Sequence, residues 1–133
     1  MADEKCVGAQ CDVKKIFEKD FSKPVCKAMQ ETIESLVNKT KGLKFDKNCK
    51  DGWLLKATIL SLDVDDPGKP TQLSLKIAID GVPLFGAARG FNASGNGKVS
   101  GIRPKKMEEE ATSIVNDVVA DTMYDKVLPQ LSK

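Results

Sequence analysis

The residues whose type and spacing most directly suggest chemistry are the four cysteines, Cys6, Cys11, Cys26 and Cys49. No two of them form a Cys-x-x-Cys pair, which excludes a zinc ribbon and a thioredoxin-like redox motif. An even number of cysteines allows two disulfides, in any of three connectivities. We expect disulfides in preference to buried thiols or metal ligands, and therefore an oxidising compartment.

The start of the chain bears on the same question. Residues Met1 to Lys5 contain two acidic residues and no apolar stretch of the kind that a secretory signal carries. Because disulfides are rare in the cytosol, we expect a signal segment to have been removed and the protein to be periplasmic or secreted. A cytoplasmic protein with reduced cysteines is the alternative.

Histidine does not occur in the sequence. Its absence excludes Ser-His-Asp and Cys-His nucleophilic sites, histidine metal sites and the usual general base of near-neutral pKa. An enzyme would have to rely on Asp, Glu, Lys or Cys alone. We therefore expect a protein that binds a partner, with no catalytic residues, no cofactor and no metal site.

A cluster of carboxylates begins like a calcium-binding loop. Asp63, Asp65 and Asp66 have the spacing of its first ligands, but Pro67 occupies the fifth position and Ser74 the twelfth, where further ligands are required. Aspartate, proline and glycine are also typical of turns. The cluster therefore indicates the solvated tip of a hairpin.

A glycine-rich stretch over residues 94–98 suggests phosphate binding, but Val99 follows Lys98 where a P-loop requires Ser or Thr. Basic side chains near the next helix start form a weaker candidate for an anion site, with a mobile connection as the alternative. The candidate binding residues are Arg89, Gly90, Lys98 and Arg103. These two arginines are the only ones among 21 basic residues, which argues against a nucleic-acid partner.

Apolar residues recur every three or four positions over residues 12–38, which is typical of an amphipathic helix. Pro24 interrupts the pattern and suits a first helical turn, so we predict a main helix from Ser22 to Asn38. Gly42 follows as its stop signal.

A second helix is predicted after Pro104. Glu108, Glu109 and Glu110 lie in its first turns, where negative charge suits the helix dipole, and an apolar stripe continues from there. Pro129 is expected to end it.

Between the helices the apolar pattern changes to a period of two. Residues 53–59 and 73–79 alternate apolar and polar side chains and predict two strands, joined by the turn formers of residues 63–70. Residues 43–45 predict a short edge strand with lysine flanks.

A third long strand is predicted over residues 82–91, after a tight turn at Asp80-Gly81, and residues 92–101 are expected to form a flexible loop. That third strand is rich in small residues, which are Gly86, Ala87, Ala88 and Gly90.

These elements predict an α+β fold. We expect an antiparallel meander of three to four strands with an N-terminal and a C-terminal helix packed on one face, in the order α-β-β-β-β-α. We expect a single domain over residues 1–133, in which residues 1–11 form an irregular segment. No apolar run is long enough for a transmembrane segment.

Residues 43–46, 52–59, 73–77 and 87–90, followed by a long helix, resemble small bacterial envelope domains. These include periplasmic assembly lipoproteins and penicillin-binding-protein activators, and the likeness spans about residues 25–130. The sequence differs from them in having four cysteines and no lipobox. The resemblance implies an adaptor in the periplasm.

Two functions follow as hypotheses. The first is an envelope or secreted adaptor that recognises a protein partner through a sheet edge or the glycine-rich third strand. The second is a carrier that holds an apolar or anionic small molecule between helices and sheet, with Lys98 or Arg89 at its head group.

Overall fold

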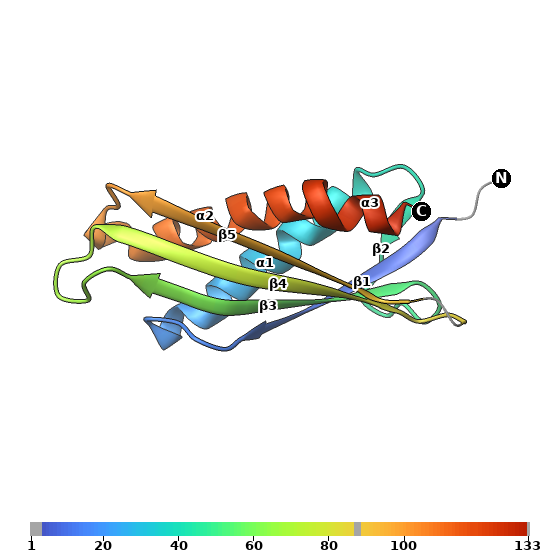
Figure 1. Ribbon diagram of the computed structural model, residues 1–133, viewed down its shortest axis with the longest axis horizontal. Coiled ribbons are helices and arrows are strands. Elements are labelled where there is room, and N and C mark those ends of the chain that lie inside the picture. Colours follow the sequence, from blue (N-terminus) through green and yellow to red (C-terminus); the bar gives the residue numbers. More distant parts are fainter. Residues whose placement is uncertain (1–3, 87–88, 133) are drawn as a thin grey trace.

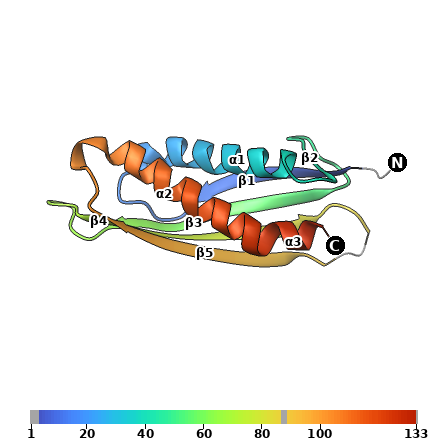
Figure 2. The same cartoon turned by 90° about the horizontal axis from the view of Figure 1, so that it is seen from above.

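The computed structural model describes residues 4–86 and 89–132. In this part of the chain, a five-stranded sheet is covered on one face by two long helices (Figures 1 and 2). The strands are β1 (Lys5–Val13), β2 (Leu43–Phe45), β3 (Trp53–Val64), β4 (Gln72–Pro83) and β5 (Phe91–Ser100). The helices are α1 (Ser22–Asn38), α2 (Met107–Thr122) and α3 (Leu128–Leu131), with short 3₁₀ turns η1 (Lys19–Phe21) and η2 (Pro104–Lys106) and a π-helical turn η3 (Met123–Val127).

The strand order is β2-β1-β3-β4-β5. Strands β3, β4 and β5 form the expected antiparallel meander, but β1 pairs in parallel with both β2 and β3. The expected α+β class with helices on one face is confirmed, whereas the purely antiparallel sheet of three to four strands is wrong, because the sheet is mixed and has five.

The hydrophobic core fills the space between the helices and the sheet. The side chains of successive strand residues point to opposite faces of the sheet. Leu55 and Ile59 therefore point toward the helices, as do the buried side chains beside them on β4. Fully buried members from all the layers include Val7, Met29, Ile33, Leu55, Ile59, Ile77, Ile79, Val115 and Val119. The predicted helix from Ser22 to Asn38 is confirmed.

Five local predictions were wrong. The segment expected to be irregular, residues 1–11, contributes most of β1, because residues 7–13 pair with β3, a partner more than forty residues away. Gly81 lies inside β4 and not in a turn. Of the expected third strand, Val82 and Pro83 end β4 and Phe91 begins β5, while the described residues between them, 84–86 and 89–90, form no strand. Ala87 and Ala88 lie outside the described residues.

The fourth and fifth errors are in the last third of the chain. The expected flexible loop over residues 92–101 is strand β5. Pro129 does not end the C-terminal helix but lies within α3, just after the π-helical turn η3. Proline has no N–H to donate, and it suits the first turn that follows such a local break in the hydrogen-bond ladder.

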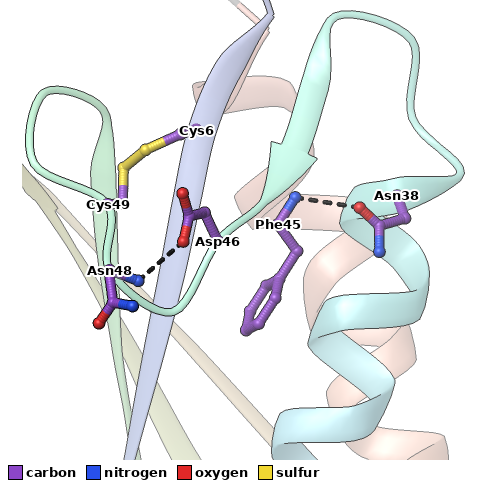
Figure 3. Close-up of a disulfide and its surroundings, with 6 residues drawn as sticks. All are labelled: Cys6, Asn38, Phe45, Asp46, Asn48 and Cys49. Atoms are coloured by element: carbon purple, nitrogen blue, oxygen red, sulfur yellow. Dashed lines mark hydrogen bonds between the residues drawn. A yellow bond between two sulfur atoms is a disulfide. The ribbon is translucent and has the colours of Figure 1, made fainter.

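Two disulfides tie the N-terminal strand to its surroundings. Cys11 on β1 is bonded to Cys26 on α1, which fastens the sheet to the helix layer. Cys6, also on β1, is bonded to Cys49 in the connection between β2 and β3 (Figure 3). All four predicted cysteines are therefore used, and none is free.

Side chains hold the connection around Cys49 in place. The backbone N–H of Asn48 donates to the Asp46 carboxylate at 2.9 Å, and the N–H of Phe45 donates to the side-chain oxygen of Asn38 at 3.0 Å (Figure 3). The last residue of α1 thus fixes the position of β2.

Candidate functional site

The structure places the four predicted binding residues at two separate ends of β5. Arg89 and Gly90 precede the strand, whereas Lys98 lies near its far end and Arg103 follows it. A ten-residue strand spans roughly 30 Å, so the four residues do not form one site. Gly90 is needed for packing, since a Cβ atom there would lie 2.5 Å from the carbonyl oxygen of Gly81.

Arg103 is engaged by carboxylates of the helix that follows it. Its Nε donates to Glu110 Oε1 at 2.9 Å, and a terminal nitrogen lies 2.8 Å from the same oxygen and 3.7 Å from Glu109. Lys106 also lies 3.7 Å from Glu109. Arg103 and Lys106 therefore already have anionic partners within the chain.

The outer edge of β5 is the most extended unpaired backbone that the sheet offers. Strand β5 pairs with β4 on one side, and no described strand pairs with its other side. Figure 2 shows it at the margin of the sheet, below α2 and α3. An edge strand of ten residues exposes a row of N–H and C=O groups to which another strand can bind.

Alternation along the strand identifies which groups point outward. Gly101, just after β5, donates its N–H to Thr71 on the β4 side, so the odd-numbered residues of β5 face β4. The even-numbered residues then direct their backbone groups away from the sheet. The outward residues are Asn92, Ser94, Asn96, Lys98 and Ser100, and the side chains of all five are exposed.

One of these outward groups already has a partner. The ammonium group of Lys126, in the π-helical turn η3 that follows α2, donates to the carbonyl oxygen of Ser94 at 2.6 Å. A lysine at this place is typical of edge strands that avoid uncontrolled pairing, because its charge must be moved before another strand can bind.

Two hollows of about 250 and 240 Å³ lie between β5 and α2, next to this edge. They meet at Asn96, Val118 and Asp121, which line both. Four carboxylates line the pair of hollows, against the two lysines Lys98 and Lys126. These carboxylates are Glu110, Asp117, Asp121 and Asp125.

The glycines of β5 explain why α2 lies so close to the strand. A Cβ atom at Gly97 would lie 2.7 Å from a methyl group of Val118, and one at Gly95 would overlap the hydroxyl of Thr122. These glycines belong to the segment expected to be a flexible loop, which is strand β5. Their role is to let the helix approach the sheet edge.

A separate apolar pocket of about 680 Å³ opens at the end of the molecule where α1 and α2 begin. Phe17 and Phe21 form part of its wall, with their rings in edge contact at 5.7 Å. Its remaining lining includes Ile16, Val64, Pro67, Pro70, Pro104 and Met107, with Lys15, Glu18 and Asp63 among the polar residues. None of the four predicted binding residues lines it.

Neither a comparison with protein-family models nor one with curated proteins finds a match. Solved structures do match. The PelC dodecamer from Paraburkholderia phytofirmans has a TM-score of 0.61 at 8% identity, over 92% of this chain and 88% of that chain. A minor lipoprotein from Acinetobacter baumannii has a TM-score of 0.51 at 9% identity, over 92% and 91% of the two chains.

The chain thus shares its fold with solved bacterial proteins, one of which is a lipoprotein. This agrees with the expected resemblance to envelope lipoprotein domains. At this low identity the likeness concerns the fold. Within the described residues, no helix has the length and apolar character needed to cross a membrane.

Proposed function

We propose that residues 1–133 form one non-enzymatic domain of the bacterial envelope, or of a secreted protein, that recognises a protein partner. The partner adds a strand to the outer edge of β5. The observation that carries this proposal is the row of outward backbone groups on a ten-residue edge strand. Main-chain pairing of this kind requires no special side chains on the receiving strand.

The proposed compartment has independent support. Two disulfides and no free cysteine suit an oxidising environment. The fold is also that of a minor lipoprotein and of PelC, whose structure is a dodecamer. Both likenesses agree with a domain that works in the envelope through contacts with other protein chains.

A pair of variants at Asn96 tests the proposal. Proline at this position removes an outward N–H without removing a hydrogen bond to β4, whereas alanine keeps the N–H. The immobilised wild-type protein, Asn96→Pro and Asn96→Ala are each exposed to an envelope extract of the source cell. Retained proteins are identified by mass spectrometry.

We expect the same retained protein with wild type and Asn96→Ala, and its loss with Asn96→Pro. Circular dichroism and thermal unfolding check that both variants are folded. Retention of the same proteins by all three forms would contradict binding at the β5 edge.

The apolar pocket beside Phe17 and Phe21 supports a second function, a carrier of an apolar small molecule. Its volume of about 680 Å³ falls in the range of small-molecule sites, and its wall is mostly apolar. Lys15 and Asp63 lie 3.9 Å apart among the residues that line the pocket, where they can orient a polar head group.

Native mass spectrometry of the protein purified from its own cells separates the two functions. A retained adduct that is lost in the variant Phe21→Asp supports the carrier. A clean mass, together with an Asn96-dependent protein partner, supports the adaptor. Phe21 is only partly buried, and a thermal unfolding control shows whether the variant still folds.

A further inference from the structure

The chemistry of the bound strand can be inferred from the helix that lies beside the edge. We infer that the segment added to β5 is basic, with lysine or arginine at every second position, where its side chains point to the face of the sheet that carries α2. This inference rests on the proposed function. Three features carry this inference: the spacing of carboxylates along α2 and η3, their lack of ion-pair partners, and the similar repeat lengths of helix and strand.

The helix and the strand run side by side in opposite directions. Gly97 faces Val118 and Gly95 faces Thr122, so two residues along β5 correspond to four residues along the helix. Two strand residues span about 6.7 Å, and four helical residues span about 6 Å. The two-residue repeat of the strand and the four-residue repeat of the helix therefore have nearly the same length where the two elements lie side by side.

The carboxylates follow this repeat. Asp117 and Asp121 on α2, and Asp125 in the π-helical turn η3, are spaced by four residues and are exposed. They line the two hollows beside β5. A strand added to the edge lies about 4.8 Å from β5 and directs every second side chain to the face on which α2 lies. On the helix side, the successive side chains of the added strand thus lie beside successive aspartates.

These three carboxylates have no ion-pair partner among the described residues. Of the four that line the hollows, only Glu110 forms an ion pair, with Arg103 at 2.8 Å. The ammonium group of Lys126 donates instead to Ser94. An incoming backbone N–H can replace Lys126 at that carbonyl, while an incoming cation meets the row of aspartates.

The charge pattern selects one class of partner strand. An acidic strand would place like charges beside three aspartates, and an uncharged one would leave them without counter-charges. Because the aspartates are exposed, each pair adds only modest affinity and is weakened by salt. The charges therefore decide which strand binds, while the main chain supplies the attachment.

Three synthetic ten-residue peptides test this inference. In each, threonine alternates with one other residue, which is lysine, glutamine or glutamate. Each peptide carries a fluorescent dye, and binding is measured by anisotropy at low and at physiological salt. The proteins are wild type, Asn96→Pro, Asn96→Ala and two double variants.

The double variant Asp117→Asn/Asp121→Asn removes two charges from the row, and the matched control Glu34→Gln/Glu108→Gln removes two exposed charges elsewhere. We expect the lysine peptide to bind best, with about tenfold weaker binding to the aspartate variant and unchanged binding to the control. Asn96→Pro should abolish binding, and added salt should weaken it.

The outcomes separate the inference from the proposed function. If the glutamine or glutamate peptide binds as well as the lysine peptide and still depends on Asn96, the inferred chemistry is wrong and the edge remains the docking site. If no peptide binds, or if binding is the same in Asn96→Pro, both are wrong. Equal loss in the two double variants also overturns the role of the aspartates.

Discussion

The side chain of Thr122 occupies the space above Gly95, so closely that a Cβ atom at residue 95 would overlap its hydroxyl oxygen. This hydroxyl donates to the carbonyl oxygen of Val118 at 2.8 Å, and Thr122 is only 4% exposed. The close approach of α2 to the sheet edge, and with it the aspartate row, therefore depends on a residue without a side chain.

The first prediction concerns this contact. Gly95→Ala should destabilise the protein by about 1–3 kcal/mol, because the added methyl group must push α2 away from β5. The free energy of unfolding in urea measures the effect.

Two further variants test whether the clash is the cause. Adding Thr122→Ala should restore part of the loss, since the nearest remaining atom at that residue, its Cβ, would lie 3.3 Å away. Gly68→Ala, where the nearest atom would be 3.5 Å away, should change stability by less than about 0.5 kcal/mol. An equal loss at positions 68 and 95 would contradict the role of the contact.

The contact also explains why β5 could not be predicted from its sequence. Glycine and asparagine are rare in strands and common in loops, and residues 92–101 are rich in both. In the structure, α2 lies so close that Gly95 and Gly97 have no room for a side chain, and the strand pairs with β4 on one side. Neither cause is visible from local spacing, because both partners lie elsewhere in the chain.

The second prediction concerns Asp65 at the β3–β4 hairpin. The hydroxyl of Thr71 donates to its carboxylate, as do the N–H groups of Thr71 at 2.9 Å and Gln72 at 3.0 Å. These donors favour the charged form and hold the pKa of Asp65 well below its usual range. A lowered pKa in the folded state contributes stability at neutral pH.

This stability should be lost as the pH falls below about 4, the ordinary aspartate value in the unfolded chain. Wild type should therefore be more stable than Asp65→Asn at pH 6, and the difference should shrink toward pH 2. Thr71→Val, which lacks the hydroxyl, should reduce the pH-dependent part. A difference between wild type and Asp65→Asn that is constant over this range would contradict the assignment.

The third prediction concerns the disulfides. Cys11 and Cys26 are 15 residues apart, and Cys6 and Cys49 are 43 apart. Loop closure predicts about 3 kcal/mol of stabilisation from the first and about 4 kcal/mol from the second. Double serine variants of each pair, compared by urea unfolding without reductant, should show losses of this order.

Reduction provides the control for that measurement. Adding a reductant to wild type should lower its stability, while the variant that lacks all four cysteines should not respond. Four reactive thiols in protein freshly isolated under denaturing conditions would contradict both disulfides.

The fourth prediction concerns Lys126. Lys126→Ala leaves the Ser94 carbonyl without its donor and removes a charge that opposes strand pairing at the β5 edge. The variant should therefore self-associate at high protein concentration. Sedimentation velocity measures this, with Lys76→Ala, an exposed lysine on β4, as the matched control. Equal self-association of the two variants would show that Lys126 does not oppose strand pairing at the β5 edge.

The helices and the first hairpin could be predicted from the sequence, because their apolar periodicity follows burial directly. Strand β1 could not, because its parallel pairing with β3 joins distant segments. The expected binding residues Arg89, Gly90, Lys98 and Arg103 are kept apart by the length of β5. The aspartate row had a signal in the four-residue spacing from Asp117 to Asp125, but its meaning depends on the strand beside it.

Amide hydrogen exchange along β5, resolved by residue with NMR, tests the central claim most directly. In the free protein the outward amides of Ser94, Asn96 and Lys98 should exchange quickly, and those of Gly95 and Gly97 slowly, since these face β4. Adding the alternating lysine peptide should protect the three outward amides. If they stay unprotected while amides around Phe17 and Phe21 change instead, binding at the β5 edge is wrong.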